Sequence, residues 1–206
     1  YNDILPYTHL SVFTNGLMPD KVLDLMLEMA GPSGARNKNV TFAILLNWQT
    51  LENISEKNHE RCKEVAEKML RTNGYSVTFS LNLYSKDQDL EKQCEEIDAI
   101  YQKVGLPKDK LYKIRVSPAF PIIGGEANIY LPIRDYPKVG RQMLKILERF
   151  PQMCFRFDCS FPPCFLDEIE EDQFSLTDRF FFYGNKQLPT TEEWKNNDYY
   201  FGCEDG

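Results

Sequence analysis

The stretch SVFTNGL, residues 11–17, decides the fold because an apolar, strand-like run ends there at three small polar residues. The run ends at Phe13, and Thr14, Asn15 and Gly16 follow it directly. A helix-like segment opens at Pro19 only a few residues later. A strand that gives way to a helix in this manner is the first half of a β/α unit.

The same pattern recurs along the chain. Further strand-like runs end at Asn47, Asn82, Ser117 and Asp158, so the polar endpoints, counted from Asn15, lie 32, 35, 35 and 41 residues apart. This period matches a βαβ repeat of about 30 residues or more. Amphipathic helical patterns fill the gaps, over residues 19–30, 56–72, 87–104 and 135–150. The sequence therefore predicts parallel strands that alternate with helices.

An open doubly wound sheet and a (β/α) barrel share this alternation. Polar residues recur at the end of every strand, and in barrel enzymes that end carries the active site. In a doubly wound sheet only the strands beside the switch point are so equipped. Asn and Ser also start turns, which is the alternative explanation for any single position. We expect an α/β fold, a partial (β/α) barrel of parallel strands with outer helices in about five β/α units, over residues 1–166. Its unpaired edge is expected at residues 10–13.

The composition limits the function classes. A net charge of −7 argues against nucleic acid as a partner. No apolar run reaches the ~18 residues of a membrane span, and the N-terminus lacks a signal-peptide pattern. Six cysteines without a secretion signal fit a reducing compartment. We expect a cytoplasmic protein that binds neither nucleic acid nor a membrane. Because the first residue is Tyr1, we also expect the chain to be a fragment.

The ordered set VFTNG, LLNW, SLN, IRVSPAFP and RFDCSFPPCFL, within residues 8–166, resembles the radical S-adenosylmethionine enzymes. It is most similar to the branch with cysteine-rich C-terminal extensions. The resemblance implies a partial barrel whose strand ends touch the cofactor, S-adenosylmethionine. The contacts that it implies come from Thr14, Asn15, Asn47, Asn82, Arg115 and Ser117. Each also has a structural alternative, such as a buried ion pair for Arg115.

The resemblance also implies chemistry that this chain does not hold alone. The family's CxxxCxxC loop, whose thiolates hold a [4Fe–4S] cluster, does not precede Thr14, and we interpret residues 123–126 as a loop turn. The implied parent enzyme cleaves S-adenosylmethionine reductively and starts radical chemistry on a peptide or other small-molecule substrate. Its electrons are expected from a donor such as a flavodoxin or ferredoxin. The isolated chain is expected to be inactive.

The stretch DCSFPPCFL, residues 158–166, carries the candidate metal ligands. Cys159 and Cys164 flank two prolines that cannot continue a strand, so we expect both thiols on an irregular loop. Two close thiolates are half of a metal or cluster site, and Cys203 adds a third candidate. The resemblance implies that such cysteines hold an auxiliary iron–sulfur cluster. The alternative is a small buried side chain, which is how we interpret Cys154.

Residues 167–206 form an acidic and aromatic extension, which we expect to pack against the barrel or another module. We interpret His9 and His59 as structural, with His59 on a polar helix face and without a partner at catalytic spacing. Two other functions stay open. One is a (β/α) barrel hydrolase or lyase with Asp158 and Glu126 as paired carboxylates. The other is a non-catalytic module whose aromatic C-terminal segment binds a protein.

Overall fold

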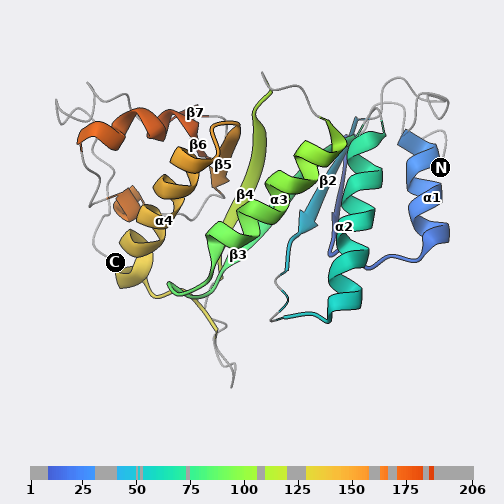
Figure 1. Cartoon of the computed structure of the whole chain (residues 1–206), viewed down its shortest axis with the longest axis horizontal. Coiled ribbons are helices and arrows are strands. Elements are labelled where there is room, and N and C mark those ends of the chain that lie inside the picture. Colours follow the sequence, from blue (N-terminus) through green and yellow to red (C-terminus); the bar gives the residue numbers. More distant parts are fainter. Residues whose placement is uncertain are drawn as a thin grey trace. The chain divides into compact units, whose positions relative to one another are not determined.

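The computed structural model of the chain describes residues 9–30, 41–49, 51, 53–72, 75–105, 110–119, 129–157, 163–166, 171–182 and 186–187. Strands and helices alternate as the sequence predicts (Figure 1). The elements are β1 (His9–Thr14), α1 (Asp20–Ala30), β2 (Thr41–Asn47), α2 (Glu56–Arg71), β3 (Tyr75–Leu83), α3 (Leu90–Val104), β4 (Tyr112–Pro118), η1 (Ile133–Asp135), α4 (Tyr136–Arg149), β5 (Met153–Phe157), η2 (Pro163–Leu166), η3 (Glu171–Arg179), β6 (Phe180–Phe182) and β7 (Lys186–Gln187).

The chain divides into two compact units. Unit 1 comprises Tyr1–Leu81 and Lys92–Lys110, and unit 2 comprises Asn82–Glu91 and Leu111–Gly206. Among the described helices, none combines the length and the apolar character that a membrane crossing requires.

In unit 1, β1 pairs with β2 and β2 with β3, all in parallel. Parallel strands that follow one another in chain order, joined by right-handed crossovers, have their helices on one face. That face is apolar: Phe79 of β3 lies 5.6 Å from the ring of Tyr101 on α3 and 5.3 Å from Trp48. On the opposite face Phe13 is 69% exposed, and Leu45 beside it is half-buried. The strands of unit 1 therefore have one helix-covered face and one more open face.

In unit 2, β4, β5 and β6 are parallel, and β7 pairs with β6 in antiparallel fashion. Four phenylalanines form the core against β5, with ring centroids 4.9 to 6.1 Å apart: Phe155, Phe157, Phe165 and Phe180. Gly140 on α4 allows a close approach to the backbone of η2, because a Cβ there would meet Phe165. Strand β6 was not anticipated, since its residues lie in the predicted extension.

The α/β class and the parallel strands are confirmed, whereas the partial barrel stays a prediction. Within the described residues β1 pairs only with β2 and β7 only with β6, so the strand order is open at both ends. The unpaired edge predicted at residues 10–13 falls on β1 as expected. The prediction of five parallel strands was too low by one, because β6 also pairs in parallel with β5.

Helix boundaries follow from capping chemistry. The hydroxyl of Ser55 accepts a hydrogen bond from the Asn58 N–H (3.4 Å) at the start of α2, and Lys68 and Arg71 lie in its last turn. The Ser55 hydroxyl pairs an N–H that has no partner within the first turn, and the two cations lie near the negative end of the helix dipole. At the end of α3, Gly105 adopts φ +77°, a left-handed conformation that suits glycine.

Candidate functional site

The first group of predicted site residues forms the β1–α1 turn of unit 1 (residues 14–19). The hydroxyl of Thr14 accepts a hydrogen bond from the Gly16 N–H (3.1 Å), and Oδ1 of Asn15 accepts one from the Leu17 N–H (3.1 Å). Such side-chain bonds to nearby backbone are the reason that Thr and Asn favour turns. Gly16 has φ +78°, which other residues rarely adopt. Thr14 and Asn15 thus shape the turn, and the Asn15 side chain is exposed.

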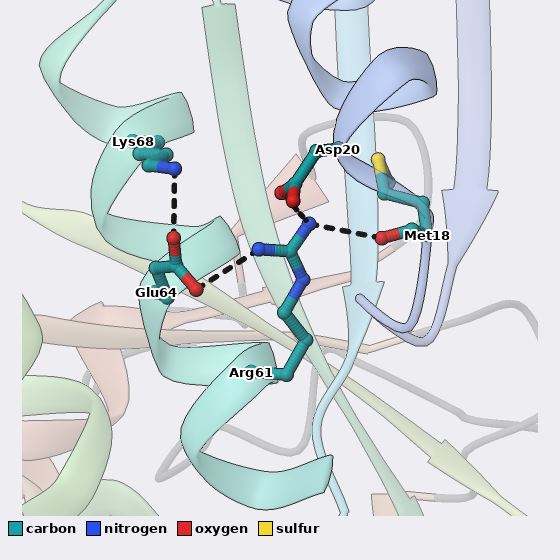
Figure 2. A network of polar contacts seen from close by, with 5 residues as sticks. All are labelled: Met18, Asp20, Arg61, Glu64 and Lys68. Carbon is teal, nitrogen blue, oxygen red and sulfur yellow. Dashed lines mark hydrogen bonds and ion pairs between the residues drawn. The ribbon is translucent and has the colours of Figure 1, made fainter.

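Helix α2 holds this turn in place through Arg61 (Figure 2). Its Nη2 donates to the carbonyl of Met18 (3.0 Å) and to Oδ1 of Asp20 (2.6 Å). Its Nη1 donates to Oε2 of Glu64 (2.9 Å), whose other oxygen lies 2.7 Å from Nζ of Lys68. One guanidinium therefore joins the turn, the first residue of α1 and the exposed side of α2.

The neighbouring residue, Cys62, contacts the same turn from the inside. Its Sγ donates to the carbonyl of Asn15 at 2.9 Å. Burial raises the pKa of the Cys62 thiol, so the group stays protonated and can donate. A Cβ added to Gly16 would lie 3.3 Å from Cα and Sγ of Cys62 and 3.2 Å from Leu46. The turn is thus packed directly against α2 and β2.

Asn47, at the end of β2, lies in register with Ser80 of β3. The next residue fixes its position, because the backbone N–H of Trp48 donates to the carbonyl of Ser80 (2.9 Å). The indole Nε1 of Trp48 donates to Oε2 of Glu96 on α3 (3.2 Å). Asn47 itself is half-buried on the more open face.

The expectation that His59 lies on a polar helix face, without a partner at catalytic spacing, was wrong. His59 is 1% exposed, its ring centroid lies 5.3 Å from that of Trp48, and its Nε2 lies 3.0 Å from Oε2 of Glu96. Neither ring nitrogen makes a hydrogen bond within the described residues, so the contact with Glu96 is a close approach of the two groups. The ring is buried against Trp48, which fits the structural interpretation of His59.

The spacing of residues along α2 could have indicated that His59 is buried. His59 precedes Cys62 by three residues and Ala66 by seven, and all three are buried on one face of α2. No local pattern could identify Glu96, which lies on another helix.

The second group of predicted site residues lies in unit 2. Asn82 is exposed near the end of β3, and its carbonyl accepts a hydrogen bond from Nε2 of Gln88 (3.1 Å). Arg115 and Ser117 are both half-buried on one face of β4, since alternate residues of a strand share a face. Arg115 lies in register with Arg156 of β5. Two cationic side chains therefore share this face of β4 and β5.

The cysteine predictions largely fall outside the described residues. Cys159 and Cys203 lie outside them, as do Asp158 and Glu126. Cys164 belongs to η2, but its side chain is outside the described part. No group of three or more potential metal ligands occurs within the described residues. Three cysteines with described side chains are buried and form no disulfide: Cys62, Cys94 and Cys154.

Cys154 behaves as the small apolar side chain that the sequence predicts. It is fully buried, its Sγ donates to the carbonyl of Tyr112 (3.4 Å), and burial raises the pKa of its thiol to about 11. A thiol that stays protonated at neutral pH is a poor metal ligand.

Comparison with known proteins gives no relative: no family model matches the chain, and neither a curated protein nor a solved structure matches it.

Proposed function

We propose that this chain is part of a radical S-adenosylmethionine enzyme and contributes β/α units of its partial barrel. In this proposal the cofactor binds where the strands end. The observation that carries the proposal is the arrangement in unit 1. Parallel strands in chain order have one helix-covered face, and polar residues end β1 and β2. Asn47 lies on the more open face.

The hydrogen-bonding groups of these residues match the polar groups of S-adenosylmethionine. Thr14, Asn15 and Asn47 offer neutral hydroxyl and amide groups, which can hydrogen-bond the hydroxyls of a ribose and the polar groups of methionine. In unit 2, Arg115 offers a guanidinium, which suits a carboxylate. When bound, the cofactor and its cluster supply the radical chemistry, and the residues named here bind and orient. Asn82 and Ser117 belong to the same proposal.

The remaining parts of the proposal concern the cluster, the substrate and the compartment. Cys159, Cys164 and Cys203 are proposed ligands of an auxiliary iron–sulfur cluster. A peptide or small molecule is the proposed substrate, and a flavodoxin or ferredoxin the proposed electron donor. A cytoplasmic location accords with the free thiols of the described cysteines, because reducing compartments keep thiols unpaired.

The test begins with the whole open reading frame that contains this chain. We expect it to encode a CxxxCxxC motif before Tyr1. After anaerobic reconstitution with iron and sulfide, and reduction by dithionite, we expect the whole protein to form 5′-deoxyadenosine. The 206-residue chain alone is expected to form none above background. A reading frame without the motif, or a reconstituted protein that yields no 5′-deoxyadenosine, would contradict the proposal.

A matched pair of variants tests the binding site itself. Asn47→Ala removes a proposed contact and should raise the Kd of S-adenosylmethionine about tenfold, the loss of roughly one hydrogen bond. Asn58→Ala on the exposed side of α2 serves as the control and should leave the Kd unchanged. Equal affinities of both variants would remove Asn47 from the site.

A further inference from the structure

We propose that Arg61 is a positioning residue that holds the β1–α1 turn in the conformation it presents at the end of β1. The connection to a cofactor rests on the proposed function, because Thr14 and Asn15 of this turn are the proposed contacts. Arg61 itself lies on α2 and acts through the turn.

The contacts of Arg61 match the shape of its guanidinium. Nη2 reaches both the Met18 carbonyl and the Asp20 carboxylate, while Nη1 is held by Glu64 of the same helix. Figure 2 shows the guanidinium between α2 and the start of α1. Arginine presents several N–H donors in a rigid plane, whereas the lysine ammonium is a compact charge on a flexible stem. Lysine at this position is therefore expected to lose part of the contact set.

Cys62 supplies a second fixed point on the same turn. Its Sγ lies 2.9 Å from the Asn15 carbonyl, and Gly16 packs against its backbone. Arg61 and Cys62 are adjacent in sequence and hold opposite ends of the turn, near Met18 and near Asn15. Loss of Arg61 removes the hydrogen bond from α2 to the Met18 carbonyl and leaves the contact of Cys62 at the Asn15 end of the turn.

The remaining local bonds of the turn are weak. The Gly16 N–H donates to the Thr14 hydroxyl and the Leu17 N–H donates to Oδ1 of Asn15, and each of these neutral hydrogen bonds adds little net stability. If loss of Arg61 lowers the fraction of turns in the binding conformation to about one tenth, the apparent Kd rises about tenfold. The effect would appear in ligand affinity and KM, with kcat unchanged, because the turn binds but does not react.

The first experiment measures amide hydrogen exchange of Gly16 and Leu17 in the full chain. We expect about tenfold faster exchange in Arg61→Met, and faster exchange also in the charge-conserving Arg61→Lys. Lys63→Met is the matched control, because it removes a neighbouring cation of α2 that pairs with Glu60 (2.9 Å) and not with the turn. Unchanged exchange in both Arg61 variants would overturn the proposal. Arg61→Lys keeps the test available where Arg61→Met does not fold.

The second experiment measures S-adenosylmethionine affinity and the split between KM and kcat in the whole reading frame. About tenfold weaker binding with an unchanged kcat supports the positioning role. Faster amide exchange with unchanged S-adenosylmethionine affinity would mean that Arg61 holds the turn but does not affect cofactor binding. A wild-type protein that binds no S-adenosylmethionine refutes the proposed function instead, while the exchange data still decide whether Arg61 holds the turn.

Discussion

The substitution Gly16→Ala tests the packing of the β1–α1 turn. Gly16 has φ +78°, and the left-handed conformation costs an L-residue about 1–2 kcal/mol. The new Cβ would also lie 3.2 Å from Leu46 and 3.3 Å from the Cα and Sγ of Cys62. Backbone at that distance cannot rotate away, and such overpacking typically costs about 1–3 kcal/mol. We expect the free energy of unfolding of unit 1 to fall by about 3 kcal/mol.

Gly105→Ala is the control, since Gly105 has nearly the same φ of +77° but no atom within 4 Å of an added Cβ. It lies in the same unit and should cost only the backbone strain, about 1–2 kcal/mol. Urea unfolding can be followed by the fluorescence of Trp48, which is 3% exposed, in a Trp194→Phe background that leaves one of the two tryptophans. Equal losses for the two substitutions would refute the reasoning from Cys62 and Leu46.

Three further predictions concern unit 2. Gly140→Ala should destabilise the chain by more than 1 kcal/mol in thermal unfolding despite better helix propensity, because the Cβ would overlap the Phe165 carbonyl. Arg179→Met should lower the free energy of unfolding in urea by about 2 kcal/mol, because it leaves backbone carbonyls at the end of α4 and the start of β5 unpaired. The control Lys138→Met changes an exposed residue and should alter this free energy by no more than about 0.5 kcal/mol. Equal effects of the two substitutions would contradict the prediction. For Cys154 the folded pKa of about 11 exceeds the ordinary 9.0, so its contribution to stability is complete below pH 9 and is lost as the pH rises to about 11. Cys154→Ala should therefore lose less stability than the wild type between about pH 8 and about pH 10.5, and parallel losses in urea unfolding would contradict this.

Local patterns in the sequence were sufficient for the elements themselves. The repeat of strand-like runs and amphipathic gaps predicted β1 to β5 and the four α-helices of the described residues, with boundaries that differ by at most three residues. The reason is that a period of two or 3.6 residues is carried by neighbours in the chain. The sequence also indicated the turn at Thr14 and Asn15, because its hydrogen bonds join residues that are two positions apart.

Contacts between distant residues could not be predicted in this way. Arg61 reaches Met18 across 43 residues, and Trp48 reaches Glu96 across 48. The short strand β6 also escaped prediction, because three phenylalanines show no periodicity and their parallel partner β5 precedes them by more than twenty residues.

The sequence by itself therefore determined the alternation of strands and helices and the polar residues at the strand ends, since both depend on local spacing. Only the tertiary structure decided that β6 adds a sixth parallel strand, that His59 is buried beside Glu96, and that α2 holds the β1–α1 turn. These features depend on which side chains meet after the helices pack on the strands. Many pairings are compatible with one pattern of periodicity, and packing selects among them through burial and hydrogen bonding.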